Sequence, residues 1–228
     1  MTDPAVAPVA HPSGVIPQGL VDKVVARRGG RLHMYASLGG PRTALVIVDM
    51  DEHSVRRSET RDRLCSRVNA VAAAVRAAGG TVAFVTTHIP TADALTASLG
   101  TDLAAEYFGE NHPGGDGVRP ATGLDVQPGD LRAVKARASA FFPGNCDLPD
   151  QLRARGIEHV LIAGLVTSVC CESSARDACE LGYQVTMVSD ALGGQSFGVH
   201  EASLAVFFRN FGDVRPGQEV IQLLGASR

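Results

Sequence analysis

The sequence predicts an α/β fold: a central parallel sheet of about six strands with helices on both of its faces. Short continuous apolar runs, typical of strands buried on both faces, occur along the chain. They alternate with segments in which apolar residues recur at helical spacing, and this alternation favours parallel strands joined by crossover helices. We expect a single α/β domain over residues 41–228, preceded by a partly extended N-terminal arm over residues 1–40.

The composition is that of a soluble globular protein. The chain has 228 residues, of which 45% are hydrophobic and 20% charged, so it can bury a sizeable core unaided. A net charge of −3 gives no reason to expect nucleic acid or an anionic membrane as a partner. No apolar stretch reaches membrane-spanning length, and no basic residue precedes an apolar run at the N-terminus. The 5 cysteines lack disulfide-framework spacing, which suits a reducing cytoplasm.

The N-terminal half supplies the first strands. Prolines at positions 4, 8, 12 and 17 predict an extended or disordered start, followed by a short helix over 19–28. The apolar run 44–48 predicts a central strand ending at Asp49. Helical apolar spacing over 61–78 stops at two glycines, and residues 81–87 form the next strand. Residues 89–131 have weak periodicity, and a connection of that length is usually a functional loop or lid.

The C-terminal half continues the alternation. A strand is expected wherever a short apolar run is bounded by turn residues, and a helix wherever small or apolar residues recur every three or four positions. The expected strands are 131–135, 160–163 and 184–189, and the expected helices are 148–155, a helix from residue 168 onward, 201–210 and 219–224.

Two adjacent cysteines follow the strand at 160–163 and differ in their helical phase. Cys171 shares a stripe of small residues with Ala175, Ala178 and Cys179, which suits close packing of a helix on a sheet. Cys170 lies off that stripe, in the first turn, where free N–H groups and the helix dipole favour a thiolate. We therefore predict that Cys170 is a nucleophile with an easily lost proton and that Cys171 is a core residue.

Two charged residues also stand at strand ends. Asp49 follows the strand at 44–48, and Lys135 ends the strand at 131–135. Ligands of parallel sheets bind beyond the carboxyl ends of the strands. A carboxylate there can act as general base toward the Cys170 thiol, and an ammonium can stabilise the thiolate. Taken singly, Asp49 could instead cap a turn and Lys135 could be solvated.

Three segments resemble the signatures of the isochorismatase-like cysteine hydrolases, which include nicotinamidases, N-carbamoylsarcosine amidases and ureidoacrylate amidohydrolases. The segments are ALVIVDM at 44–50, KARASAF at 135–141 and GLVTSVCCESSARDA at 164–178. The likeness extends from about residue 43 to residue 224, and the third segment is the most specific.

The resemblance implies an Asp49–Lys135–Cys170 triad on a central parallel sheet. It also implies a cis peptide between Val166 and Thr167 that directs the N–H groups of Thr167 and Cys170 at an oxyanion. A homo-oligomer, dimer or tetramer, is expected from the same likeness.

Two departures from the family pattern affect the pocket and the metal. Asp51-Glu52-His53-Ser54 replaces the usual continuation after the first strand, so the pocket floor is unusual. The Asp-x-His metal motif of nicotinamidases is also missing, because Thr86 stands two residues before His88. A lone histidine is a poor metal site, so we expect no metal and no other cofactor.

Two other catalytic arrangements are weaker. Residues 194–198 match the G-x-S-x-G elbow, but the serine does not directly follow its strand, and His200 precedes Asp213 in the chain. We interpret His200 as a helix residue. A Cys170–His88 dyad stays open as an alternative to the Asp–Lys arrangement.

The predicted function is hydrolysis of a C–N bond in a small carboxamide, ureido or lactam substrate through a thioester on Cys170. Tyr107 and Phe108 in the long loop, with Phe141 and Phe142, are candidates for the pocket wall. One alternative is an inactive family member that serves binding or assembly. Another is a vinyl ether hydrolase of the isochorismatase type, although those enzymes lack the cysteine.

Overall fold

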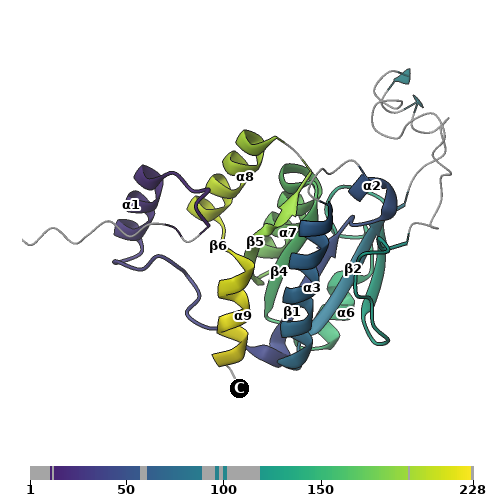
Figure 1. The fold of residues 1–228 in the computed structure, drawn as a ribbon, viewed down its shortest axis with the longest axis horizontal. Helices are drawn as coiled ribbons and strands as arrows, with labels where there is room; N and C mark the ends of the chain where they lie inside the picture. The colour runs from purple at the N-terminus through teal and green to yellow at the C-terminus, as the bar shows by residue number, and fades with distance from the viewer. Residues whose placement is uncertain are drawn as a thin grey trace, which may run out of the picture.

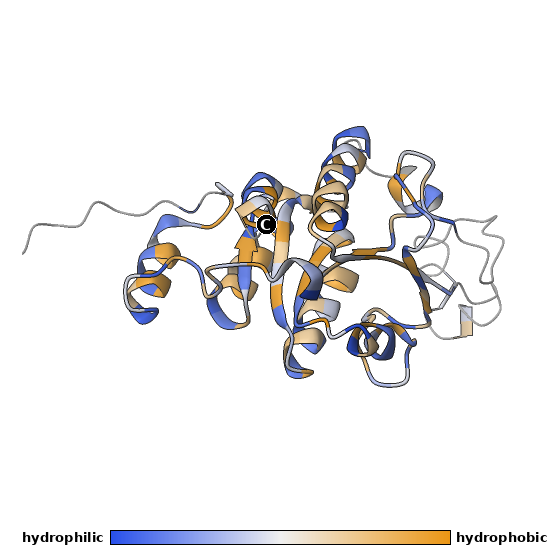
Figure 2. Ribbon diagram, turned by 90° about the horizontal axis from the view of Figure 1, so that it is seen from below, coloured by the Kyte–Doolittle hydropathy of each residue, from blue (hydrophilic) through white to orange (hydrophobic). Residues whose placement is uncertain are grey.

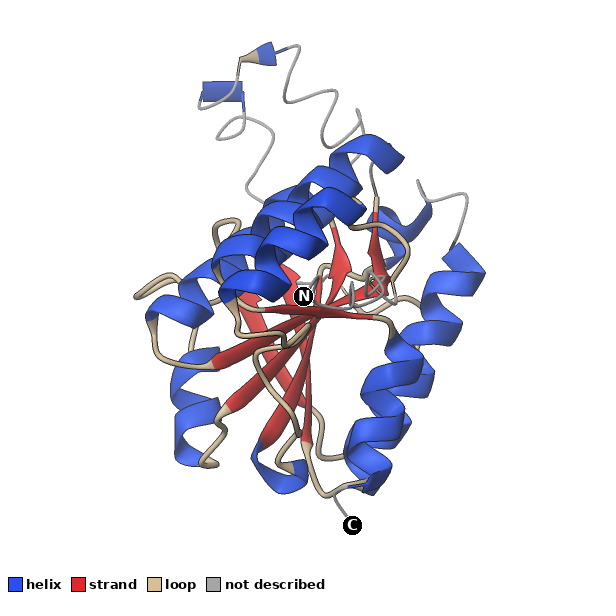
Figure 3. Cartoon of the chain, turned by 90° about the vertical axis from the view of Figure 1, so that its left-hand side faces the viewer, coloured by secondary structure: helices blue, strands red, loops and turns tan. Residues whose placement is uncertain are grey.

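The predicted α/β architecture is confirmed: six parallel strands form one sheet with helices on both faces (Figures 1 and 3). The structure is a computed structural model. It describes residues 11, 13–56, 61–88, 96–97, 100–101, 119–194 and 196–226. The strand order is β3-β2-β1-β4-β5-β6, and each neighbouring pair is parallel.

The bounds of the first four strands agree closely with the sequence prediction. The strands are β1 (Thr43–Val48), β2 (Thr81–Thr87), β3 (Leu131–Lys135), β4 (His159–Leu165), β5 (Gln184–Gly193) and β6 (Asp213–Arg215). The residue patterns gave no signal for β6, because three residues are too few to show periodicity. Strand β5 continues four residues beyond its predicted end at 189, after a register shift between Ile162 and Gly164 of β4.

The helices divide between the two faces of the sheet. They are α1 (Gln18–Arg27), α2 (Glu52–Arg56), α3 (Arg61–Ala77), α6 (Leu148–Ala154), α7 (Glu172–Glu180), α8 (Phe197–Asn210) and α9 (Gly217–Ala226), with short turns η1 (Gly40–Arg42) and η2 (Thr167–Cys171). Helices α3 and α9 pack on one face, and α6, α7 and α8 pack on the other (Figure 1). Apolar residues gather along the strands and on the sheet-facing sides of these helices (Figure 2).

The strand order creates a switch point between β1 and β4. From β1 the chain adds β2 and β3 toward one edge, then returns to place β4 on the other side of β1 and builds outward to β6. Ligands of open α/β sheets bind at such a point, beyond the carboxyl ends of the strands. Asp49 follows β1 and Cys170 follows β4, so both residues flank this point.

The segment before β1 is anchored by the buried carboxylate of Asp213 in β6. Asp213 accepts hydrogen bonds from the backbone of Met34 (2.8 Å) and Tyr35 (3.1 Å) and pairs with Arg28 at 3.3 Å. The described part of the predicted arm therefore packs against the sheet edge, with α1 against α8. Residues 1–10 and 12 lie outside the described residues. Among the helices that the structure describes, none is long and apolar enough to cross a membrane.

Gly164 lets the ends of β1 and β4 approach each other closely. It pairs with Val48 and has φ +118°, a conformation that side chains rarely adopt. A methyl group added at this position would overlap the carbonyl oxygen of Val48, which immediately precedes Asp49. The sheet therefore needs glycine here to hold the Asp49 and Cys170 segments together.

We expect Gly164→Ala to lower the free energy of unfolding by roughly 3 kcal/mol or more, because it combines backbone strain with overlap in the core. Gly182→Ala is the matched control: Gly182 has φ +91° but nothing within 4 Å of the added methyl, so its loss should be about 1–2 kcal/mol. Urea unfolding followed by circular dichroism measures both. Equal losses of unfolding free energy in the two variants would contradict the view that the close approach of β1 and β4 requires Gly164.

Candidate active site

The predicted triad residues meet at the carboxyl end of the sheet. The Nζ atom of Lys135 lies 2.8 Å from Oδ2 of Asp49 and 3.5 Å from Sγ of Cys170. Lys135 has 0% exposure and Asp49 has 7%, while Cys170 is partly buried. A long side chain is needed, because Lys135 must reach from β3 past β2 to the switch point. The alternative of a solvated Lys135 is therefore wrong.

Backbone conformation directs Asp49 toward Lys135. Val48 contributes to the buried cluster on the α7 side of the sheet, so an extended residue 49 would point to the opposite side. Asp49 instead has φ +49°, in the left-handed region, and its N–H donates to the carbonyl of Val85 at 2.8 Å. This local turn places its carboxylate on the same side as Lys135. A non-glycine residue in this region is uncommon and frequently occurs at functional sites.

A fourth residue, Thr87, contacts both members of the ion pair. Its hydroxyl donates to Oδ1 of Asp49 at 2.7 Å and accepts a hydrogen bond from Nζ of Lys135. Sequence reasoning missed Thr87 because a threonine at a strand end has no distinctive pattern. A usable signal existed in the predicted strands, since Thr87 and Lys135 are the last residues of β2 and β3 and pair in the sheet.

The charges in the site support one another. Burial disfavours the ammonium of Lys135, but its interactions with Asp49 and Cys170 together outweigh this effect, and the pKa of Lys135 is raised. Lys135 therefore stays protonated at neutral pH. The resting ion pair places a positive charge beside the thiol and a carboxylate within reach of it.

The thiol of Cys170 does not have the lowered pKa that its position at a helix start predicts. Burial and the negative charge of Asp49 raise its pKa to about 12, against the opposing influence of Lys135. The prediction of an easily lost proton is therefore wrong. The helix-terminus effect is small compared with the burial of a thiol beside a carboxylate. At neutral pH the resting group is a thiol.

Cys170 belongs to a π-helical turn, η2, that connects β4 to α7. The carbonyl of Val166 accepts hydrogen bonds from the amides of Val169 (3.1 Å) and Cys171 (3.2 Å). The cis peptide joins Leu165 and Val166, one bond earlier than the resemblance implied. Leu165 still pairs with Gly193 in the sheet, so the chain changes direction directly after it.

The side chain of Thr167 attaches this turn to two neighbouring segments. Its hydroxyl donates to the carbonyl of Gly193 at 3.2 Å and lies 2.9 Å from Nδ1 of His200. His200 is a helix residue, as predicted, and burial lowers its pKa. Ser196, the serine of the elbow match, lies at the N-cap of α8 rather than directly after β5.

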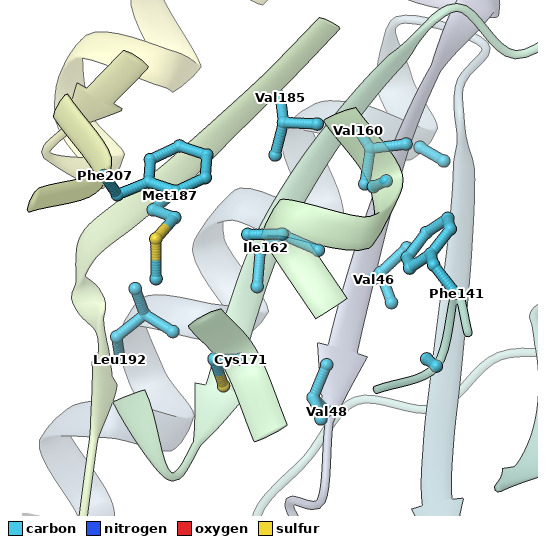
Figure 4. Close-up of a cluster of buried hydrophobic side chains, with 14 of the residues drawn as sticks. Val46, Val48, Phe141, Val160, Ile162, Cys171, Val185, Met187, Leu192 and Phe207 are labelled. Atoms are coloured by element: carbon cyan, nitrogen blue, oxygen red, sulfur yellow. The ribbon is translucent and has the colours of Figure 1, made fainter. Parts of the chain in front are cut away.

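Cys171 is a core residue, as predicted from its helical phase. It has 0% exposure and, with Ala175 and Ala178, joins the cluster on the α7 side of the sheet, part of which Figure 4 shows. Burial raises its pKa well above the usual thiol value, so it is a poor nucleophile. Cys179, at the end of the same stripe, is only partly buried.

The prediction of a pocket wall made by Phe141 is wrong. Phe141 has 0% exposure and packs in the cluster of Figure 4, with an edge-to-face contact to Tyr183 at 5.7 Å between ring centroids. Hydrogen bonds from the amides of Ala140 to Ser174 and of Phe141 to Ser139 turn this segment inward. Phe142, by contrast, is 51% exposed. Tyr107 and Phe108 lie outside the described residues.

The unusual segment after Asp49 has a structural role in the described part of the chain. Asp51 accepts hydrogen bonds from the backbone N–H of Ser54 (2.9 Å) and from its hydroxyl (2.8 Å), and so holds the start of α2. Glu52 accepts from the amide of Thr122 at 2.6 Å, which fixes the chain as it returns toward β3. Within the described residues, no group of three or more His, Cys, Asp or Glu side chains is arranged to hold a metal.

The isochorismatase domain profile matches residues 43–219 of this chain. The chain belongs to the isochorismatase family of hydrolases. It is 32% identical over 187 residues to the isochorismatase family protein YwoC of Bacillus subtilis, covering 79% of this chain and 93% of that protein. A crystal structure titled cysteine hydrolase, from Pseudomonas syringae pv. phaseolicola, has a TM-score of 0.71 and 26% identity, covering 86% of this chain and 98% of that one.

A shorter likeness of higher sequence identity links the chain to a named amidohydrolase. The ureidoacrylate amidohydrolase RutB of Variovorax paradoxus is 47% identical over 74 residues, which is 31% of this chain and 29% of that protein. The family is therefore established over most of the chain, whereas the likeness to RutB covers less than a third of either protein.

The opposing effects of Asp49 and Lys135 on the thiol predict a contrast in alkylation. At pH 9, well below the Cys170 pKa of about 12, the alkylation rate follows the thiolate fraction. Asp49→Asn removes the charge that raises this pKa, so iodoacetamide should react about tenfold faster at Cys170. Lys135→Ala removes the charge that lowers it, so reaction should slow by about tenfold. Peptide mass spectrometry gives both rates.

His88→Ala serves as the control for the alternative Cys170–His88 dyad. It should leave the alkylation rate within about twofold of wild type, which corresponds to a change of less than about a third of a unit in the thiol pKa. If His88→Ala slows alkylation while neither triad substitution changes it, the Asp–Lys assignment is incorrect.

Proposed function

We propose that this protein is a cysteine-dependent amidohydrolase that cleaves a C–N bond in a small carboxamide or ureido compound through a thioester intermediate. The observation that carries the proposal is the buried contact of Lys135 with both Asp49 (2.8 Å) and Cys170 (3.5 Å). Carboxylate, ammonium and thiol are the groups needed to activate a sulfur nucleophile and later protonate a nitrogen leaving group.

In the first half-reaction the thiol proton passes from Cys170 to Asp49 as sulfur attacks the substrate carbonyl. A C–S bond forms, and the carbonyl oxygen becomes an oxyanion. We assign the N–H groups of Thr167 and Cys170 to this oxyanion, because both belong to the tight turn η2 that carries the thiol. Asp49 then gives its proton to the nitrogen, the C–N bond breaks, and ammonia or an amine leaves.

In the second half-reaction water replaces the amine. Asp49, again a carboxylate, takes a proton from a water molecule as the water oxygen attacks the thioester carbonyl. The tetrahedral intermediate expels sulfur, which recovers the proton from Asp49, and the product is a carboxylic acid from a carboxamide or a carbamic acid from a ureido compound. Lys135 stays protonated throughout, as its raised pKa favours.

The high pKa of Cys170 is compatible with these proton transfers. Loss of the thiol proton to solvent would leave the buried site with a net negative charge, which burial opposes. Transfer of the same proton to Asp49 leaves the net charge of the site unchanged. The nucleophile is therefore generated inside the site, at the moment of attack, rather than stored as a free thiolate.

The likeness to RutB and the C–N chemistry of the site favour ureido acids and primary amides as substrates. Ammonia release across a panel of primary amides, ureido acids and lactams tests this. Suppose that none of these compounds releases ammonia while Cys170 is still alkylated selectively. That result would favour an inactive binding protein or cleavage of a different bond, such as the vinyl ether of isochorismatase.

The two adjacent cysteines should respond oppositely to substitution. Cys170→Ala should lower kcat/KM by about a thousandfold or more, because the covalent nucleophile is lost. Cys171→Ser should keep most activity and lower the free energy of unfolding by about 1–3 kcal/mol, because its hydroxyl is buried in an apolar cluster. Steady-state kinetics and urea unfolding measure these effects. A folded Cys171→Ser enzyme as inactive as Cys170→Ala would contradict the assignment.

Activity should survive exhaustive chelation. The position that carries the metal-binding aspartate in nicotinamidases holds Thr86, and a single histidine binds metal weakly. Ammonia release is compared before and after treatment with EDTA and dipicolinate. Activity lost to the chelator and restored by zinc, iron or manganese would mean that a metal takes part.

A further inference from the structure

Four neighbouring strand ends each contribute one polar side chain to the site. In the order of the sheet these are Lys135 from β3, Thr87 from β2, Asp49 after β1 and Cys170 after β4. Of these four residues, Thr87 has no role in the proposed reaction steps. Its position between Lys135 and Asp49 gives it contact with both charges.

We infer that Thr87 is a positioning residue, whose hydroxyl holds the Lys135 ammonium and the Asp49 carboxylate in the arrangement that acts on Cys170. The inference rests on the proposed function only in that it takes Cys170 as the reactive thiol.

The hydrogen bonds of the Thr87 hydroxyl can run in one direction only. The ammonium of Lys135 has no acceptor, so it must donate to the Thr87 oxygen. The hydroxyl has one proton, which is then left for Oδ1 of Asp49, an acceptor at 2.7 Å. The resulting chain from ammonium to hydroxyl to carboxylate fixes the rotamer of Thr87 and links the two charges without a competing arrangement.

Thr87 also completes the surroundings of a fully buried ammonium. Lys135 has three N–H groups and three partners within reach: Oδ2 of Asp49, the hydroxyl of Thr87 and Sγ of Cys170. With 0% exposure, Lys135 has no solvent to replace a lost partner. Removing the hydroxyl would leave one ammonium N–H unsatisfied, and the side chain would shift to find another acceptor. Such a shift weakens its hold on the sulfur.

Loss of the hydroxyl acts on Cys170 through Lys135. Thr87 contacts two titratable groups, Asp49 directly after β1 and Lys135 in β3, and Lys135 in turn contacts Cys170 in η2. A displaced Lys135 stabilises the thiolate less. Slower formation of the thiolate follows.

The test is alkylation of Cys170 by iodoacetamide at pH 9 in the full-length protein, which needs no knowledge of the substrate. Thr87→Val keeps the shape and removes the hydroxyl, and we expect about tenfold slower reaction, equal to one unit of thiol pKa. Thr87→Ser restores the hydroxyl and should react within about twofold of wild type. Thr86→Val is the matched control: its side chain is 8% exposed on the opposite face of β2, and it should not change the rate.

A double-mutant cycle separates positioning from general structural damage. If Thr87 acts mainly through Lys135, then Thr87→Val should slow alkylation by no more than about twofold in the Lys135→Ala background. Three results would overturn this inference and leave the proposed function intact. They are an unchanged alkylation rate in Thr87→Val, a rate in Thr87→Ser as slow as in Thr87→Val, or a tenfold effect of Thr87→Val that remains in the Lys135→Ala background. An alkylation rate indifferent to Lys135→Ala would overturn the triad, and this inference with it.

Discussion

The buried ion pair between Asp49 and Lys135 is the constraint on which the rest of the site depends. Both charges leave water when the sheet is covered, and each loses solvation that a surface pair would keep. Burial alone would disfavour the ammonium, yet its interactions with Asp49 and Cys170 raise the pKa of Lys135. A buried pair of this kind contributes little net stability, so its chemistry is the better explanation for its presence.

The parallel sheet supplies the geometry that the ion pair requires. Because all six strands run the same way, their carboxyl ends lie along one edge, and four neighbouring ends bring four polar side chains together. The close approach of Gly164 to Val48 draws the β1 and β4 ends together at the switch point. The left-handed backbone of Asp49 then turns its carboxylate toward Lys135.

Much of this arrangement could be predicted from the sequence because the signals are local. Apolar runs gave β1 to β4 nearly to the residue, and helical phase separated the buried Cys171 from the neighbouring Cys170. The positions of Asp49, Lys135 and Cys170 at strand ends were enough to expect them at one edge of the sheet. The family followed from three short segments that contain these same residues, and the domain match over 43–219 agrees.

Other features depend on groups that are distant in sequence, and only the tertiary structure decided them. Phe141 joined the core because the chain turns inward at Ser139, and Thr87 joined the site because β2 lies between β1 and β3. The pKa of Cys170 rose where its position in the helix predicted a fall. Strand and helix patterns are set by neighbours along the chain, whereas burial and charge depend on everything that packs nearby. The sequence by itself therefore determined which polar residues meet at this edge of the sheet, and the packing determined how they act on one another.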